Sequence, residues 1–355
     1  MPKTIIRLLI VLGVPLLIGI VSFFYLRSFF LSPADSKSTK EVIVEVKPGS
    51  SFRSFCKKLS DEGIVNHWWA LDFMSQIKKS DTQIQAGEYL LSPSMTPRQI
   101  MAKLSKGDVH KRIVLIREGE DLWQVAEALE AADVVKASSF IKSATDPDLL
   151  TRMEFDGASL EGYLFPETYY FSGQQSVINV IWRFVDEFNK NWPEAHDARI
   201  KELGFTVNEV LTLASIIEKE SGNFKEQPRI SAVFHNRLRS GIKLESDPTL
   251  VYGLRDFGGT VLNKHKDRET PYNTYRNFGL PPGPICNPGK TAIEAALHPL
   301  ETEELFFVAD GHGGHVFSKT LKEHNVAVRK YRNLIKERKK GSANGASQPD
   351  NSGVK

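Results

Sequence analysis

One carboxyl group past the middle of the chain has the sequence context of a proton donor. The segment from Thr206 to Gly222 reads TVNEVLTLASIIEKESG, and apolar residues recur in it at helical spacing from Val207 onward. This pattern predicts an amphipathic helix. At roughly 100° per residue, Glu218 falls within the apolar stripe and Glu220 points well away from it. A carboxyl on the buried face of a helix loses hydration, so its pKa rises and it can hold a proton near neutral pH.

Both ends of this predicted helix carry terminal signals. Thr206 and Glu209 have the spacing of a capping box. Gly222 is the expected stop, because glycine is common just past the last helical turn. A glutamate at the end of an amphipathic helix is more often solvated or salt-bridged than catalytic, so the helix alone does not establish the chemistry.

Aromatic, amide and carboxylate residues gather in motifs on both sides of the helix. Residues 160–169 read LEGYLFPETY, a mixture typical of saccharide clefts, since sugar faces stack on aromatic rings and hydroxyls need fixed acceptors. Residues 279–289 read GLPPGPICNPG, which excludes a helix or a central strand. The residues that we expect to orient or line a substrate are Glu161, Tyr163, Asn236, Asp247, Tyr252, Tyr272, Asn273 and Tyr275. The alternative is that they pack the turn and hold the proline-rich loop in place.

Composition and cysteine usage indicate neither a nucleic-acid partner nor a metal site. Net charge is +3 and the pI is about 8.6, which is too mild a basic balance to argue for nucleic acid. Cys56 and Cys286 form no close pair, so we expect no disulfide framework. His312 and His315 flank a glycine-rich turn, but no third ligand lies nearby in the sequence. We therefore expect no metal and no cofactor.

The N-terminus predicts a membrane anchor. Leu8 to Leu26 is nineteen residues without a charge, preceded by Lys3 and Arg7. That length can span a bilayer, and the positive flank favours a cytoplasmic N-terminus. We expect an uncleaved signal anchor, with residues 1–7 in the cytoplasm and the body of the chain across the membrane; a cleaved signal peptide is the alternative.

The rest of the chain predicts an α+β protein with a repeat region before a catalytic domain. After the anchor at 8–26 and a polar linker at 27–40, a strand, a glycine turn and a helix occur at 42–65 and again at 112–135. Both copies resemble LysM modules, small βα folds that bind N-acetylhexosamine chains; a βα scaffold without a ligand is the alternative. We assign 41–150 to this LysM-like region, 151–340 to a mixed α+β catalytic domain and 341–355 to a disordered tail.

Several motifs in a fixed order resemble those of the endolytic murein transglycosylases, the MltG or YceG-like family. They include EGYLFPETY at 161–169, ASIIEKES at 214–221 and FHNRL at 234–238. SDPT at 246–249, YNTY at 272–275, GLPPGPI at 279–285 and NPG at 287–289 extend the match. The resemblance covers residues from about 40 to 338.

The resemblance implies cleavage of the β-1,4 bond between N-acetylmuramic acid and N-acetylglucosamine within nascent peptidoglycan strands, with 1,6-anhydro ends as product. It also implies a bacterial inner-membrane protein with a periplasmic catalytic domain that releases strands from the peptidoglycan polymerases, the penicillin-binding proteins. The family's catalytic glutamate maps onto Glu218. In the soluble lytic transglycosylases and goose-type lysozymes, however, the catalytic glutamate directly precedes serine, which Glu220-Ser221 also does.

Two other functions remain open on the sequence. A lysozyme-type hydrolase would pair Glu218 with a second carboxylate, for which Asp247 is the candidate. A scaffold without catalysis would bind peptidoglycan through the LysM-like repeats. A lytic transglycosylase needs only one carboxyl, because one glutamate can give a proton to the leaving oxygen and then take a proton from the 6-hydroxyl.

Overall fold

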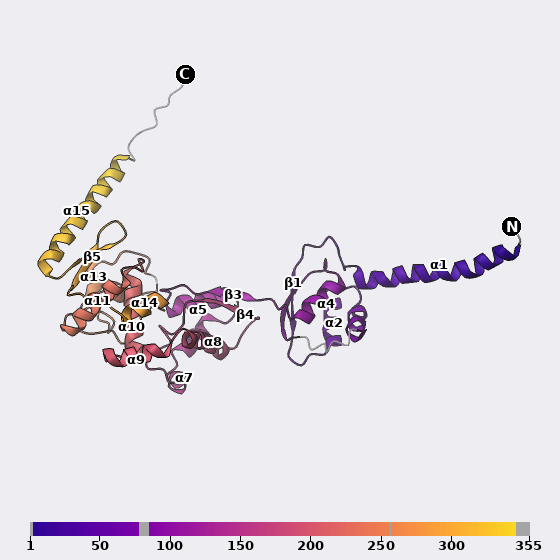
Figure 1. Cartoon of the computed structure of the whole chain (residues 1–355), viewed down its shortest axis with the longest axis horizontal. Helices are drawn as coiled ribbons and strands as arrows, with labels where there is room; N and C mark the ends of the chain where they lie inside the picture. The colour runs from indigo at the N-terminus through magenta and orange to yellow at the C-terminus, as the bar shows by residue number, and fades with distance from the viewer. Residues whose placement is uncertain (1–2, 78–84, 256, 346–355) are drawn as a thin grey trace, which may run out of the picture. The chain divides into compact units, whose positions relative to one another are not determined.

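A computed structural model describes residues 3–77, 85–255 and 257–345 of the chain (Figure 1). The residues fall into two compact units, the first comprising residues 1–113 with 170–174 and the second residues 114–169 with 175–355. Both units combine helices with small sheets, so the predicted α+β class is confirmed. The predicted tail from 346 onward lies outside the described residues, while 341–345 belong to the last helix.

The first unit contains the apolar N-terminal helix. Helix α1 spans Lys3–Leu31, and its stretch Leu12–Leu31 is long and apolar enough to cross a membrane, with none of it buried against the protein. Figure 1 draws it as a long helix leading from the N-terminus. By length and composition it is a candidate anchor, as the sequence predicts.

The rest of the first unit is a two-stranded sheet covered by short helices. Its elements are β1 (Val42–Val46), α2 (Phe52–Asp61), α3 (Trp68–Ile77), β2 (Gly87–Leu91) and α4 (Pro97–Lys106). The strands β1 and β2 pair antiparallel with Val44 opposite Tyr89, and both side chains are fully buried. Thr96 caps α4, and Pro97 occupies its first turn, where a missing N–H costs nothing.

The helix of the second predicted repeat copy belongs to the second unit, whereas its strand crosses the boundary between the units. Its strand and helix, β3 and α5, begin 70 residues after β1 and α2, because β3 starts at Arg112 and α5 at Leu122, against Val42 and Phe52. The strand β3 pairs with β4, whereas β1 pairs with β2. The two copies thus share the order and spacing of strand and helix, but their helices lie in different compact units.

Helices surround α10 in the second unit. The elements after β3 (Arg112–Leu115) are α5 (Leu122–Ala131), α6 (Ala137–Ala144), α7 (Pro147–Arg152), β4 (Thr168–Phe171), α8 (Val177–Lys190), α9 (Glu194–Leu203), α10 (Val207–Glu220), α11 (Gln227–Arg239), α12 (Pro248–Val251), α13 (Asn263–Lys266), α14 (Lys290–Leu297), β5 (Phe306–Ala309), β6 (His315–Ser318) and α15 (Leu321–Gly345). Helix α10 packs against α9, α11, α12 and α14. Figure 1 shows α9, α11 and α14 close to α10. Its core residues are therefore fixed from several sides.

Candidate active site

Helix α10 begins and ends where the sequence predicts, but no left-handed glycine caps its C-terminus. The capping box is confirmed: the Thr206 side chain accepts from the Glu209 N–H at 3.2 Å, and the Glu209 carboxylate accepts from the Thr206 N–H at 2.8 Å. The helix ends at Glu220, directly before Ser221-Gly222, as the sequence predicts. Ser221 ends the helix by turning extended, with φ −141° and ψ 122°, and Gly222 does not adopt a left-handed conformation.

The helical-phase prediction for Glu220 is wrong. Every residue from Val210 to Ile217 is buried, so α10 is enclosed on all sides and has no single buried stripe. Helical phase therefore cannot separate Glu218 from Glu220, and the surroundings of each carboxyl must be compared directly.

Glu220 is half-buried and lines a cavity of about 320 Å³. Its Oε1 accepts a hydrogen bond from the Ser246 hydroxyl at 2.6 Å. Loss of hydration raises the pKa of Glu220 to about 7, and the nearby charge of Asp247 acts in the same direction. The hydrogen bond from Ser246 and the positive groups of His315 and Arg237 oppose the rise. This carboxyl can hold a proton near neutral pH and release it.

Glu218 has a different environment. Its Oε2 accepts from the backbone N–H of Gly289 at 3.1 Å. Partial burial raises its pKa, and the charge of Glu118 adds to the rise, while the Gly289 N–H and Lys219 lower it. Glu218 is not among the residues that line the cavity of Glu220. Its carboxyl is engaged with the proline-rich loop that carries Gly289.

Two of the predicted substrate residues share the cavity with Glu220. Asp247 and Tyr275 both line it, and the Tyr275 hydroxyl donates to Asp247 Oδ1 at 2.7 Å. Asp247 is exposed, so its carboxylate is available to a ligand. Tyr275 fixes that carboxylate at the cavity.

Four other predicted substrate residues lie in packed or fully bonded positions. Glu161 is 1% exposed and accepts from the Leu122 N–H with both oxygens at 3.0 Å. Tyr163 is 3% exposed in the core cluster. The Asn236 amide donates to the carbonyls of Thr302 and Glu304, and the Asn273 amide to those of Lys266 and Arg268. These four side chains hold the scaffold together, which is the alternative that the sequence left open.

The last two, Tyr252 and Tyr272, pack against each other with ring centroids 4.6 Å apart and ring planes tilted by 45°. Tyr252 donates to Glu161 Oε2 at 3.1 Å and lines a separate cavity of about 310 Å³ together with Trp123. The structure thus does not bring all the predicted residues to one site.

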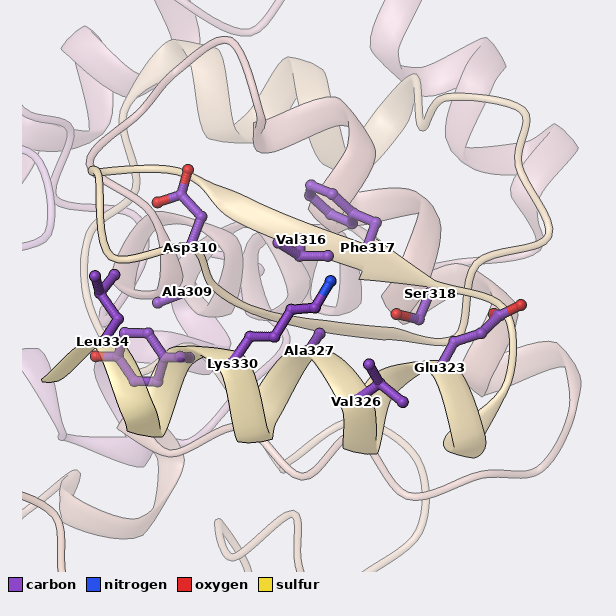
Figure 2. A pocket seen from close by; sticks show the side chains of 11 residues that line it. Ala309, Asp310, Val316, Phe317, Ser318, Glu323, Val326, Ala327, Lys330 and Leu334 are labelled. Carbon is purple, nitrogen blue, oxygen red and sulfur yellow. The ribbon is translucent and has the colours of Figure 1, made fainter. Parts of the chain in front are cut away.

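A larger cavity, of about 630 Å³, lies between the β5–β6 hairpin and α15 (Figure 2). Its two carboxyl groups are committed to backbone donors: Asp310 accepts from the N–H groups of His312 and Gly314, and Glu323 from those of Lys319 and Thr320. These bonds lower the pKa of both groups, so both stay ionised near neutral pH. The larger cavity therefore has no carboxyl poised to donate a proton.

A model of the YceG-like family matches residues 44–330. The chain belongs to the YceG-like family. It is 34% identical over 327 residues to the endolytic murein transglycosylase of Bacillus subtilis, covering 87% of this chain and 90% of that protein. It is 30% identical over 331 residues to the protein of that name from Streptococcus pneumoniae, covering 84% of this chain and 60% of that one. The crystal structure of a YceG-like protein from Listeria monocytogenes matches with a TM-score of 0.57 and 34% identity, over 81% of this chain and 99% of that one.

The site of this YceG-like chain includes residues that sequence reasoning missed. Ser246 stands next to Asp247 in the SDPT motif, but its contact with Glu220 joins positions 26 residues apart, for which the sequence has no local signal. His315 was considered only as a metal ligand. Its Nδ1 lies 2.8 Å from Glu226 Oε2, and the ring lines the cavity. Across the described ranges, no cluster of three or more His, Cys, Asp or Glu side chains could hold a metal ion.

Proposed function

We propose that this chain is a peptidoglycan lytic transglycosylase that cuts within glycan strands, with Glu220 as its acid/base. The proposal is carried by one observation: the half-buried Glu220 lines a cavity beside Asp247 and Tyr275. Loss of hydration there raises the pKa of its carboxyl to about 7. The curated relatives, named endolytic murein transglycosylases, supply the substrate class. The bond cleaved is the β-1,4 bond between N-acetylmuramic acid and N-acetylglucosamine, as the sequence resemblance implies.

One carboxyl suffices for the reaction. Protonated Glu220 gives its proton to the glycosidic oxygen as the bond from that oxygen to C1 of the muramic acid breaks. The resulting carboxylate then takes the proton of the 6-hydroxyl on the same sugar while that oxygen bonds to C1. The products are a free 4-hydroxyl and a 1,6-anhydro end, and Glu220 regains its proton.

The environments of the two glutamates favour Glu220 over Glu218. A proton donor must be accessible to its substrate and must hold a proton at the working pH. Glu220 meets both conditions at the cavity, whereas Glu218 is bonded to the backbone of Gly289. Glu218 stays the prediction of the sequence, and the following experiment separates the two.

The test compares Glu220→Gln with Glu218→Gln in the purified full-length protein acting on peptidoglycan glycan strands. We expect Glu220→Gln to lose roughly 10²- to 10⁴-fold in kcat, the usual contribution of a general acid, and Glu218→Gln to stay within a few-fold of wild type. The wild-type kcat should fall as pH rises through about 7, because the ionised carboxyl has no proton to give. If Glu218→Gln loses far more activity than Glu220→Gln, Glu218 is the acid/base instead. Full activity in both variants would exclude catalysis by either and favour a peptidoglycan-binding scaffold.

A hydrolase remains the second candidate, because Asp247 lies in the same cavity as Glu220. A lysozyme-type enzyme uses a second carboxylate as nucleophile or as the base that activates water. Mass spectrometry of the digest decides between the two reactions. Transglycosylation yields anhydro ends lighter by one water than the reducing ends that hydrolysis leaves. Loss of activity in Asp247→Asn together with reducing ends would support the hydrolase.

We also propose that α1 anchors the protein in the bacterial inner membrane with the N-terminus in the cytoplasm. The support is the apolar stretch Leu12–Leu31 and the cations Lys3 and Arg7 before it. The catalytic domain would then lie on the periplasmic side, where newly made strands leave the polymerases, and the LysM-like region at 41–150 would contact the same strands. In spheroplasts, external protease should digest the body of the chain; full protection would show the opposite orientation.

A further inference from the structure

The Glu220 carboxyl has an asymmetric environment. Its Oε1 receives the hydroxyl proton of Ser246 at 2.6 Å, a distance typical of a strong bond to a carboxyl oxygen. Ser246 is only 1% exposed, so water does not compete for this contact. Among the described residues no hydrogen bond reaches the other oxygen, Oε2, and Glu220 lines the cavity.

Two threonines fix Ser246 in place. The Ser246 N–H donates to Thr274 Oγ1 at 2.9 Å, and the Ser246 carbonyl accepts from Thr249 Oγ1 at 2.6 Å. The two threonine oxygens lie 2.9 Å apart, and both residues are buried. The backbone of Ser246 is therefore held from both sides, which leaves its hydroxyl directed at Glu220.

A serine hydroxyl has one proton to donate. Since that proton is directed at Oε1, this oxygen acts as an acceptor, and the proton of the carboxyl itself is favoured on Oε2. We propose that Ser246 is a positioning residue that keeps the transferable proton of Glu220 on Oε2 and stabilises the carboxylate formed after the first transfer. This inference rests on the proposed function and assigns the reacting atom within it.

Other charged groups around Glu220 also affect the pKa of its carboxyl. Asp247 disfavours the carboxylate, and Arg237 on α11 and His315 on β6 favour it. Glu245, Tyr275 and His324 line the same cavity. Replacement of Ser246 leaves all of these in place, so a change in pH dependence would report on the hydroxyl alone.

The decisive variant is Ser246→Ala, assayed across pH on peptidoglycan glycan strands. Loss of the donor to the carboxylate should move the basic limb of the kcat profile up by about one pH unit, given the usual strength of a hydrogen bond to a charged group. We expect kcat at neutral pH to fall roughly tenfold, with little change in KM. Ser246→Thr keeps the hydroxyl and should keep the wild-type limb.

The control is Ser231→Ala on α11. Ser231 is fully buried, and its hydroxyl has no hydrogen-bond partner within the described part of the chain. This variant removes the same atom from the same unit and should leave the pH profile unchanged. The position of the limb does not depend on how much of a variant is folded, so partial unfolding of Ser246→Ala would not mask the result.

This inference would be overturned if Ser246→Ala kept both the wild-type kcat and the wild-type position of the basic limb of the kcat–pH profile. If Glu220→Gln is inactive in the same assay, the proposed function survives that outcome. If Glu220→Gln is fully active, the proposed role of Glu220 is wrong, and the inference about Ser246 is rejected with it.

Discussion

Glu161 carries the most enclosed carboxyl described in the second unit. Both of its oxygens accept from the Leu122 N–H at the start of α5, and Asn287 and Tyr252 also donate to it. An anion at a helix N-terminus is stabilised by the free N–H groups there. Burial outweighs these bonds and raises the pKa of Glu161 to about 8. Its role is to join α5 to the proline-rich loop.

This pKa makes stability depend on pH. Between the ordinary value of 4.5 and about 8, the folded protein keeps a proton that the unfolded chain releases. The free energy of unfolding should therefore fall as pH rises through this range, by at most about 1.4 kcal/mol per pH unit. In Glu161→Gln this contribution disappears. Urea unfolding at pH 5.5 and 8 should show a smaller drop than in wild type, and exposed Glu301→Gln should match wild type; equal drops in all three proteins would contradict the assignment.

Helix α10 shows what the sequence could and could not predict at this scale. The helix and its capping box are local features, and local spacing is enough to find them. The choice between Glu218 and Glu220 depends on Gly289 and Ser246, which the fold brings in from distant positions. The helical-phase argument assumes that one face is buried and the other is exposed, whereas α10 is buried on all sides.

At the scale of elements, the EGYLFPETY turn is docked onto the proline-rich loop. Gly162 has a φ of +88°, and a Cβ there would lie 2.5 Å from Pro284 Cγ. Its N–H and that of Leu164 both donate to Asn287 Oδ1, at 2.8 Å and 3.0 Å. The sequence correctly excluded helix and strand from the proline-rich loop, but which segment packs against it is a tertiary property.

Replacing Gly162 should disturb this docking. In Gly162→Ala the left-handed backbone and the contact with Pro284 both oppose the new methyl group, so we expect a loss of about 1–3 kcal/mol in the free energy of unfolding. Gly222→Ala is the matched control, because Gly222 is not left-handed and has open space around its would-be Cβ. Chemical denaturation measures both. An unchanged Gly162→Ala would mean that the turn can relax away from the loop.

At the scale of the whole molecule, the sequence predicts which helices and strands occur better than it predicts the boundaries of the two compact units. Composition and spacing indicated the apolar anchor helix and two strand–helix stretches separated by 70 residues. The division into units could not be inferred, because residues 170–174 belong with the first unit although they include the second half of β4, whose first half belongs to the second unit. Membership of a unit depends on contacts between distant segments, which a linear pattern does not contain.

Burial protects both cysteines of the chain from oxidation. Cys56 lies in the core of the first unit and Cys286 in the second, and both are free thiols. Burial raises the pKa of Cys56 to about 12 and also raises that of Cys286. Since the thiolate is the species that oxidants and disulfides attack, both sulfurs are inert while the protein is folded. A chain built in this way can mature in an oxidising compartment without enzymes that make or correct disulfides.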